Sequence, residues 1–166
     1  MIDLNQLIRH LGLEPLPVEG GYFRQTWVSD NSVSIPGYES PRPAGTAIYY
    51  LLTSDPDSFS AMHRLASDEI YHFYLGDPVE MLLLDERVGA QRIVLGQDLL
   101  GGQHAQYIVS RLVWQGSRVI PGGRFTLLGT TMAPGFDKRD FALGGRDQLV
   151  RQFPGQADLI CELTRG

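Results

Sequence analysis

Short runs of aromatic and β-branched residues, broken by Gly, Pro, Asp and Ser, occupy most of the chain between Tyr22 and Met132. Runs of this kind with turn residues between them are typical of β-strands. They predict strands over Tyr22–Val28, Gly45–Thr53, Phe59–Leu65, Glu69–Leu75, Val79–Asp85, Gln91–Leu95, Gln106–Ser110, Gly116–Ile120 and Arg124–Met132. Nine short strands at this spacing favour an all-β sandwich or a closed barrel.

Helical spacing of apolar residues occurs at the two ends of the chain. The first set is Leu4, Leu7, Ile8 and Leu11, with Asp3 as a suitable N-cap and Gly12 as a suitable stop. The second lies around Pro154-Gly155 and comprises Leu149, Val150 and Phe153, then Leu159, Ile160 and Leu163. We therefore expect one short N-terminal helix and two short C-terminal helices that cover one end of the barrel.

The length of the chain, 166 residues, is that of one domain with a sizeable core of its own. No linker or low-complexity segment divides the chain, and the Pro-rich stretch 35–43 is interpreted as an exposed loop. The prediction is a single domain over residues 1–166.

Charge and cysteine content exclude several classes of protein. The net charge is −5 and Lys138 is the only lysine, which argues against nucleic acid as a partner. No apolar stretch approaches the roughly 20 residues of a membrane helix, so no membrane partner is expected either. The lone Cys161 cannot form an internal disulfide, and no secretory signal pattern opens the chain. A cytoplasmic protein is expected.

The densest group of ionisable side chains lies between His63 and Asp77. We interpret this stretch as two strands that meet at a Ser67-Asp68 turn, which would bring His63 close to Glu69. Because side chains alternate along a strand, Glu69 shares a face with Tyr71 and Phe73. His72 points the other way, so we place it in a contact between sheets or subunits.

Two kinds of chemistry suit an accessible His63 and Glu69. An imidazole has a pKa near neutrality, and a neighbouring carboxylate can orient it as a general base. The same two side chains are also metal ligands. Their residue types alone leave both uses open.

The stretch resembles the first motif of the cupin superfamily, G-x5-H-x-H-x(3,4)-E-x6-G. His63, Glu69 and Gly76 match, whereas Asp57 replaces the leading Gly and Leu65 replaces the second His. In the second motif, G-x5-P-x-G-x2-H-x3-N, Pro121 and Gly123 match, and Gly116 lies one position late. Thr126 and Thr130 stand where the His and Asn belong. Two of the three metal-binding histidines of metal cupins are thus replaced, so the resemblance disfavours a divalent metal; His63 and Glu69 are the ligands that remain.

Further segments resemble a compact branch of bacterial and fungal cupins. They are Val18–Arg24, Thr46–Leu52, His63–Asp77 and Ala133–Asp137. The resemblance implies a jelly-roll β-barrel, a homodimer and a shape shared with dTDP-keto-sugar epimerases.

Four further residues join the predicted site. Tyr71 and Phe73 are expected to line the cavity, and Thr126 occupies the position of a missing metal ligand. Arg24 has two interpretations of equal weight. It either clamps a carboxylate or phosphate of the ligand, because guanidinium offers a planar fork, or it forms a salt bridge to Glu69 or Glu19.

The leading functional hypothesis is a small-molecule-binding cupin whose ligand is related to a sugar or a keto acid. The alternative is an isomerase or epimerase in which His63 takes a proton next to a carbonyl, Glu69 assists and Arg24 holds an anionic group. A metal-dependent oxygenase is a third hypothesis, and a storage or structural role, which predicts a filled or closed cavity, is a fourth.

Overall fold

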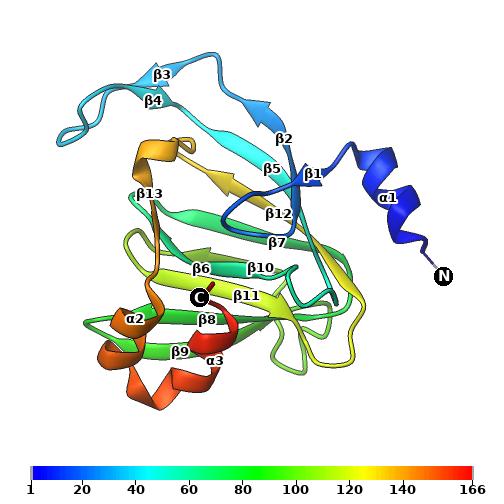
Figure 1. Cartoon of the computed structure of the whole chain (residues 1–166). Helices are drawn as coiled ribbons and strands as arrows, with labels where there is room; N and C mark the ends of the chain where they lie inside the picture. Colours follow the sequence, from blue (N-terminus) through cyan, green and yellow to red (C-terminus); the bar gives the residue numbers. More distant parts are fainter. Residues whose placement is uncertain (1, 166) are drawn as a thin grey trace.

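Two antiparallel sheets face each other in the computed structural model, which describes residues 2–165 (Figure 1). The six-stranded sheet has the order β1-β2-β5-β12-β7-β10, and the five-stranded sheet has the order β13-β6-β11-β8-β9. Their strands are β1 Glu14–Pro15, β2 Tyr22–Val28, β5 Thr46–Thr53, β6 Ser60–Leu65, β7 Glu69–Gly76, β8 Val79–Asp85, β9 Gly89–Leu95, β10 Gln106–Val109, β11 Trp114–Val119, β12 Phe125–Met132 and β13 Phe141–Leu143. A separate two-stranded ribbon joins β3 Ser32–Val33 to β4 Arg42–Pro43.

The nine predicted strands are all present, and Tyr22–Val28 and Val79–Asp85 match to the residue. The prediction omitted β1, β3, β4 and β13, which are only two or three residues long. Runs this short show no alternation, so their pairing depends on neighbours that are distant in the sequence. The all-β prediction is confirmed.

The N-terminal helix, α1 Leu4–Leu11, begins and ends as predicted. The Asp3 carboxylate accepts hydrogen bonds from the backbone N–H groups of Asn5 and Gln6, and Gly12 adopts the left-handed conformation with φ of 61°. The apolar side of α1 packs with Leu13, Leu51 and Leu127 on the outer face of the six-stranded sheet.

The C-terminal helices, α2 Arg146–Gln152 and α3 Ala157–Glu162, cover a face of the barrel instead of an end. Two short 3-10 turns, η1 Lys138–Asp140 and η2 Pro154–Gln156, precede β13 and α3. Leu149 and Ile160 pack against Met62, Leu82 and Trp114, whose side chains point outward from the five-stranded sheet. These outward positions are apolar and need cover, which the helices supply. Among residues 2–165, no helix is long and apolar enough to span a membrane.

The main core lies between the two sheets. Tyr50, Leu52, Met81, Leu83 and Leu128 are buried there, on strands of both sheets. Toward the end where β6 stops and β7 begins, the inward-facing residues become polar. The interior is therefore apolar over most of its length and polar at one end.

Candidate functional site

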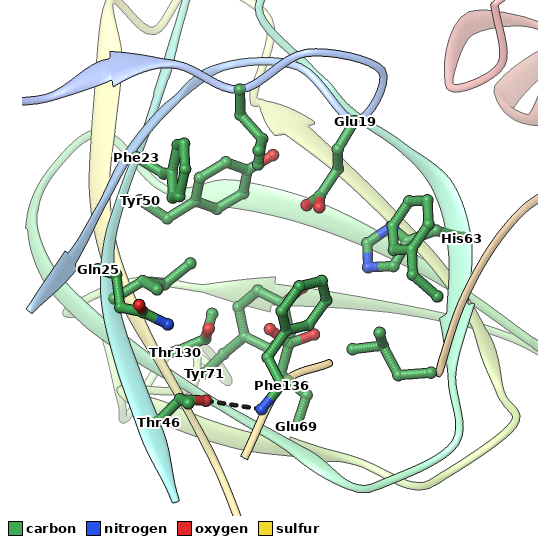
Figure 2. Close-up of a pocket in the computed structure, with 14 residues that line it drawn as sticks. Glu19, Phe23, Gln25, Thr46, Tyr50, His63, Glu69, Tyr71, Thr130 and Phe136 are labelled. Carbon is green, nitrogen blue, oxygen red and sulfur yellow. Dashed lines mark hydrogen bonds between the residues drawn. The ribbon is translucent and has the colours of Figure 1, made fainter. Parts of the chain in front are cut away.

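A cavity of about 90 Å³ opens between the two sheets at the polar end of the barrel (Figure 2). Its lining combines polar and apolar side chains from both sheets and from two loops. The polar ones are Glu19, Gln25, Thr46, Tyr50, His63, Glu69, Tyr71 and Thr130, and the apolar ones are Leu16, Phe23, Ile48, Leu65, Phe136 and Phe141. Among the pockets of the described chain, this one contains both His63 and Glu69.

His63 is held by its backbone neighbours and by an aromatic ring. Its Nδ1 lies 2.7 Å from the Ala61 carbonyl oxygen, which can only accept, so Nδ1 carries the proton. The imidazole stacks on Phe141 at 5.2 Å between ring centroids and is 2 % exposed. In the neutral ring, Nε2 then remains as the acceptor for a group in the cavity.

Glu69 lies on the opposite sheet from His63. The two strands meet at the Ser67-Asp68 segment as expected, but this segment carries the chain from β6 in the five-stranded sheet to β7 in the six-stranded sheet, so the strands do not pair with each other. The two side chains still reach the same cavity because both point into the barrel.

Burial dominates the chemistry of Glu69. It raises the pKa of the Glu69 carboxyl, because the charged form loses its hydration, while the nearby His63 imidazole acts in the opposite direction. The Gln115 side-chain amide donates to Oε2 of Glu69 at 2.9 Å. Burial likewise raises the pKa of Tyr71 well above its ordinary value, so Tyr71 stays a neutral hydroxyl.

Glu19 is a third ionisable side chain at the cavity, whereas from the sequence we expected it only as a salt-bridge partner of Arg24. Figure 2 shows its carboxylate pointing into the cavity from the loop before β2. Ser60 Oγ donates to Glu19 Oε1 at 3.0 Å, and the Glu19 carbonyl accepts from the Ala61 N–H at 2.8 Å. Both contacts come from β6, the strand that carries His63.

The loop around Glu19 depends on its two glycines. Val18, Gly20 and Gly21 have positive φ values of 73°, 107° and 71°. A Cβ on Gly20 would overlap the Phe59 carbonyl oxygen, so only glycine fits there. Arg165 Nε closes the loop by donating to the Val18 carbonyl at 2.9 Å. A glutamate directly before Gly-Gly was the sequence signal that could have identified this residue.

Three predicted ligand-binding residues lie outside the cavity. Arg24 is on the outer face of β2, where its guanidinium lies 5.5 Å from the Tyr49 ring centroid, because Phe23 and Gln25 take the inward positions. It forms no salt bridge to Glu19 or Glu69. Phe73 packs into the core beside the cavity, and the Thr126 hydroxyl donates to the Asp77 carbonyl at 2.5 Å.

Tyr71 lines the cavity, as expected. His72 points outward, where its Nε2 lies 3.0 Å from Thr131 Oγ1.

Phe136 stands at the mouth. It belongs to the segment between β12 and η1, is 40 % exposed, and its backbone N–H donates to Thr46 Oγ1 at 2.9 Å (Figure 2). Phe136 thus lines the cavity while remaining partly exposed to solvent.

The side chains present do not fit a tightly bound transition metal. In the described part of the chain, no three His, Cys, Asp or Glu side chains are placed to share an ion. Leu65 contributes only carbon to the lining, and the Thr126 hydroxyl is already hydrogen bonded elsewhere. Two remaining ligands on opposite sheets are too few for a stable site.

Comparison with known proteins agrees with this architecture. Residues 5–144 match the family model described as Cupin superfamily (DUF985). A hypothetical protein from Leishmania major is 30% identical, with a TM-score of 0.88 over 99% of this chain and 100% of that one. Protein SO0799 from Shewanella oneidensis is 29% identical, with a TM-score of 0.86 over 99% of each chain.

A more distant structure shares the fold alone. A dTDP sugar isomerase from Desulfovibrio desulfuricans G20 is 15% identical, with a TM-score of 0.54 over 86% of this chain and 85% of that one. No curated protein is similar enough to the chain to count as a match. The family model spans most of the chain, the jelly-roll sheets enclose a cavity at one end, and the chain therefore belongs to the cupin superfamily.

Proposed function

We propose that the cavity binds a small, uncharged molecule that carries hydroxyl or carbonyl groups, of the sugar type. The observation that carries this proposal is the charge of the lining. Two carboxyl groups, Glu19 and Glu69, and one imidazole, His63, converge there without any Lys or Arg. A carboxylate or phosphate on the ligand would find no cationic Lys or Arg and would be repelled by the Glu19 carboxylate, whereas sugar hydroxyls would donate to the carboxyl oxygens of Glu19 and Glu69. This favours a sugar over a keto acid.

The size and the walls of the cavity agree with such a ligand. A cavity needs on the order of 10–15 Å³ to hold one water molecule. The cavity of about 90 Å³ therefore holds a compact molecule of a few heavy atoms or one end of a larger molecule. Phe23, Phe136 and Phe141 supply ring faces on which the apolar side of a sugar can pack.

A thermal-shift series tests the proposal. Neutral aldoses, ketoses and polyols are compared with keto acids of similar size, since a ligand that binds only the folded chain raises the unfolding midpoint. We expect a neutral compound to stabilise the wild type and the control Arg24→Gln, whose changed side chain is outside the cavity. The same compound should lose its effect with Glu19→Gln and His63→Ala. Stabilisation by keto acids alone would overturn the proposal.

A second candidate function is isomerisation or epimerisation of a carbonyl-bearing sugar. The observation that favours it is the placement of His63 and Glu69 on opposite sheets across one cavity. His63 Nε2 would take a proton from the carbon next to the carbonyl, and protonated Glu69 would give its proton to the carbonyl oxygen, producing an enediol. Return of a proton to either carbon or face would complete the reaction without a metal or redox cofactor.

Solvent deuterium exchange tests this second candidate. Incubation of a bound keto or aldo sugar in deuterium oxide should label the carbon next to the carbonyl, and mass spectrometry measures the label. We expect at least a hundredfold slower labelling with His63→Ala, the usual lower size of a general-base contribution. Labelling at the same rate in wild type and His63→Ala would exclude the mechanism while leaving binding intact.

A further inference from the structure

A second pocket lies on the outer side of the five-stranded sheet, away from the barrel cavity. Its volume is about 560 Å³, and β6, β11 and the turns after β8 and β10 contribute to it. Arg64, Arg87 and Arg111 line it together with Trp114. Residues 63 and 65 face the barrel interior, so Arg64 between them points to the opposite side of the same strand.

Two of these arginines have no acidic partner. Arg87 is paired with Asp85 at 3.5 Å, but neither Arg64 nor Arg111 has a carboxylate within ion-pair distance among residues 2–165. The lining contains three arginines and two acids, Asp85 and Glu86, so its net charge is +1. The whole chain, by contrast, has a net charge of −5. This pocket therefore has the opposite electrostatic character from the barrel cavity.

Arg64 is held in place by an aromatic side chain. Its guanidinium carbon lies 4.5 Å from the centroid of the Trp114 ring, and Trp114 is only 5 % exposed. Stacking on a buried indole orders the guanidinium and leaves its N–H edge free to donate. The indole also places a fluorescent group against the pocket.

Arg111 is presented by a turn with an unusual backbone. Leu112, which also lines the pocket, has φ of 66°, a left-handed conformation that costs a leucine free energy. Two hydrogen bonds hold the turn, from the Arg111 N–H to Asp68 Oδ1 at 2.7 Å and from the Leu112 N–H to the Leu65 carbonyl at 2.8 Å. Strained backbone of this kind persists where the surrounding structure holds it, and it is common at binding sites.

We propose that this outer pocket binds a phosphate-type anion, held by the guanidinium groups of Arg64 and Arg111. Guanidinium matches the oxygens of a phosphate in paired hydrogen bonds, and the two groups reach the pocket from separate elements, so a ligand with several anionic oxygens can engage both. The site is independent of the barrel cavity, because the β-sheet separates them.

The test uses inorganic pyrophosphate as the probe and tryptophan fluorescence as the readout. The chain has two tryptophans, Trp27 and Trp114, and Trp27 is 52 % exposed, so Trp27→Phe leaves Trp114 as the sole reporter. Titration at constant ionic strength should change the Trp114 emission saturably. In the same background, Arg111→Gln should weaken binding about tenfold or more, the equivalent of losing one charge-assisted hydrogen bond. Arg111 is exposed, so this variant keeps the core intact.

Control variants distinguish the site from general attraction of anions. Arg151→Gln removes an exposed arginine on α2 outside the pocket and should leave the affinity unchanged. Glu69→Gln in the barrel cavity should also leave it unchanged, so this proposal and the proposed function succeed or fail separately. The absence of a saturable fluorescence change, or equal affinities for Arg111→Gln and Arg151→Gln, would overturn the proposal.

Discussion

Glu69 is a buried acid in the candidate site, and its carboxyl group has an environment very different from that of an acid on the surface. It is 7 % exposed, it accepts from the Gln115 amide, and the imidazole across the cavity only partly offsets the cost of its charge. Its pKa is raised above the ordinary value of 4.5. The folded chain therefore binds a proton at Glu69 over a pH range in which the unfolded chain has already released it.

This difference makes stability depend on pH. As pH rises from about 4.5 through the raised pKa, the folded state loses stability, because its charged carboxylate is buried and that of the unfolded chain is hydrated. Glu69→Gln removes this loss and can still accept from Gln115. We expect the unfolding temperature of Glu69→Gln to rise relative to that of the wild type as pH increases through this range.

Thermal unfolding monitored between pH 4 and pH 8 checks this expectation. The exposed acid Glu39 provides the control, and Glu39→Gln should follow the wild type at every pH. Parallel curves for Glu69→Gln and the wild type would show that the two protonation states of Glu69 are equally stable in the fold.

At the scale of elements, the loop between β1 and β2 connects backbone shape to the chemistry of the cavity. Gly20 and Gly21 allow the chain to turn tightly against Phe59 and β5, and this turn presents Glu19 to the cavity. The same loop is held at Glu19 by the Ala61 N–H of β6 and at Val18 by the Arg165 guanidinium. Three distant parts of the sequence thus meet to place one carboxylate.

Gly20→Ala should damage both stability and binding. A matched control is Gly37→Ala, because Gly37 also has a positive φ, 89°, but faces open space. The control pays only the backbone strain, about 1 kcal/mol, whereas Gly20→Ala adds overlap with the Phe59 carbonyl oxygen and should cost on the order of 2–4 kcal/mol. Urea unfolding measures both values, and similar losses for the two variants would show that the loop around Gly20 can relax.

On the scale of the whole molecule, the outer face of the six-stranded sheet is only partly covered. The helix α1 covers the part around Leu51 and Leu127, while Trp27, Tyr74 and Ile108 on β2, β7 and β10 are 52, 45 and 57 % exposed. His72 lies on this face as well. Together with the resemblance to dimeric cupins, these residues lead us to propose that a second copy of the chain covers this face.

Sedimentation velocity measures the association. We expect a dimer for the wild type and a shift toward monomer for Tyr74→Lys combined with Ile108→Lys, because two buried charges in an apolar contact would be left unpaired. Val88→Lys changes a residue that is 70 % exposed on the β8–β9 turn, and should remain dimeric. A wild type that is monomeric at high concentration, or a double variant that is still dimeric, would contradict the proposal.

Local patterns in the sequence were sufficient for most of the secondary structure. Runs of aromatic and β-branched residues between turn residues predicted the nine longer strands, alternation along the strand placed His72 on the face opposite to Glu69, and Asp3 and Gly12 defined the ends of α1. Such signals depend on neighbours two to four residues away, so they can be read without knowing the fold. The cupin resemblance added the barrel, which the family model and the sheets confirm.

The sequence by itself determined how side chains alternate along the strands and that His63 and Glu69 can share a cavity. Only the tertiary structure decided which other side chains line that cavity. Arg24 and Glu19 belong to one segment, and the more obvious ligand-binding residue, Arg24, lies outside while Glu19 lies in the cavity. Which face of β2 becomes the interior depends on where α1 and the opposite sheet pack. Arg64 and Arg111 are likewise separated by 47 positions in the sequence. They reach one pocket only because strands pair across the five-stranded sheet and because Leu112 adopts its strained turn.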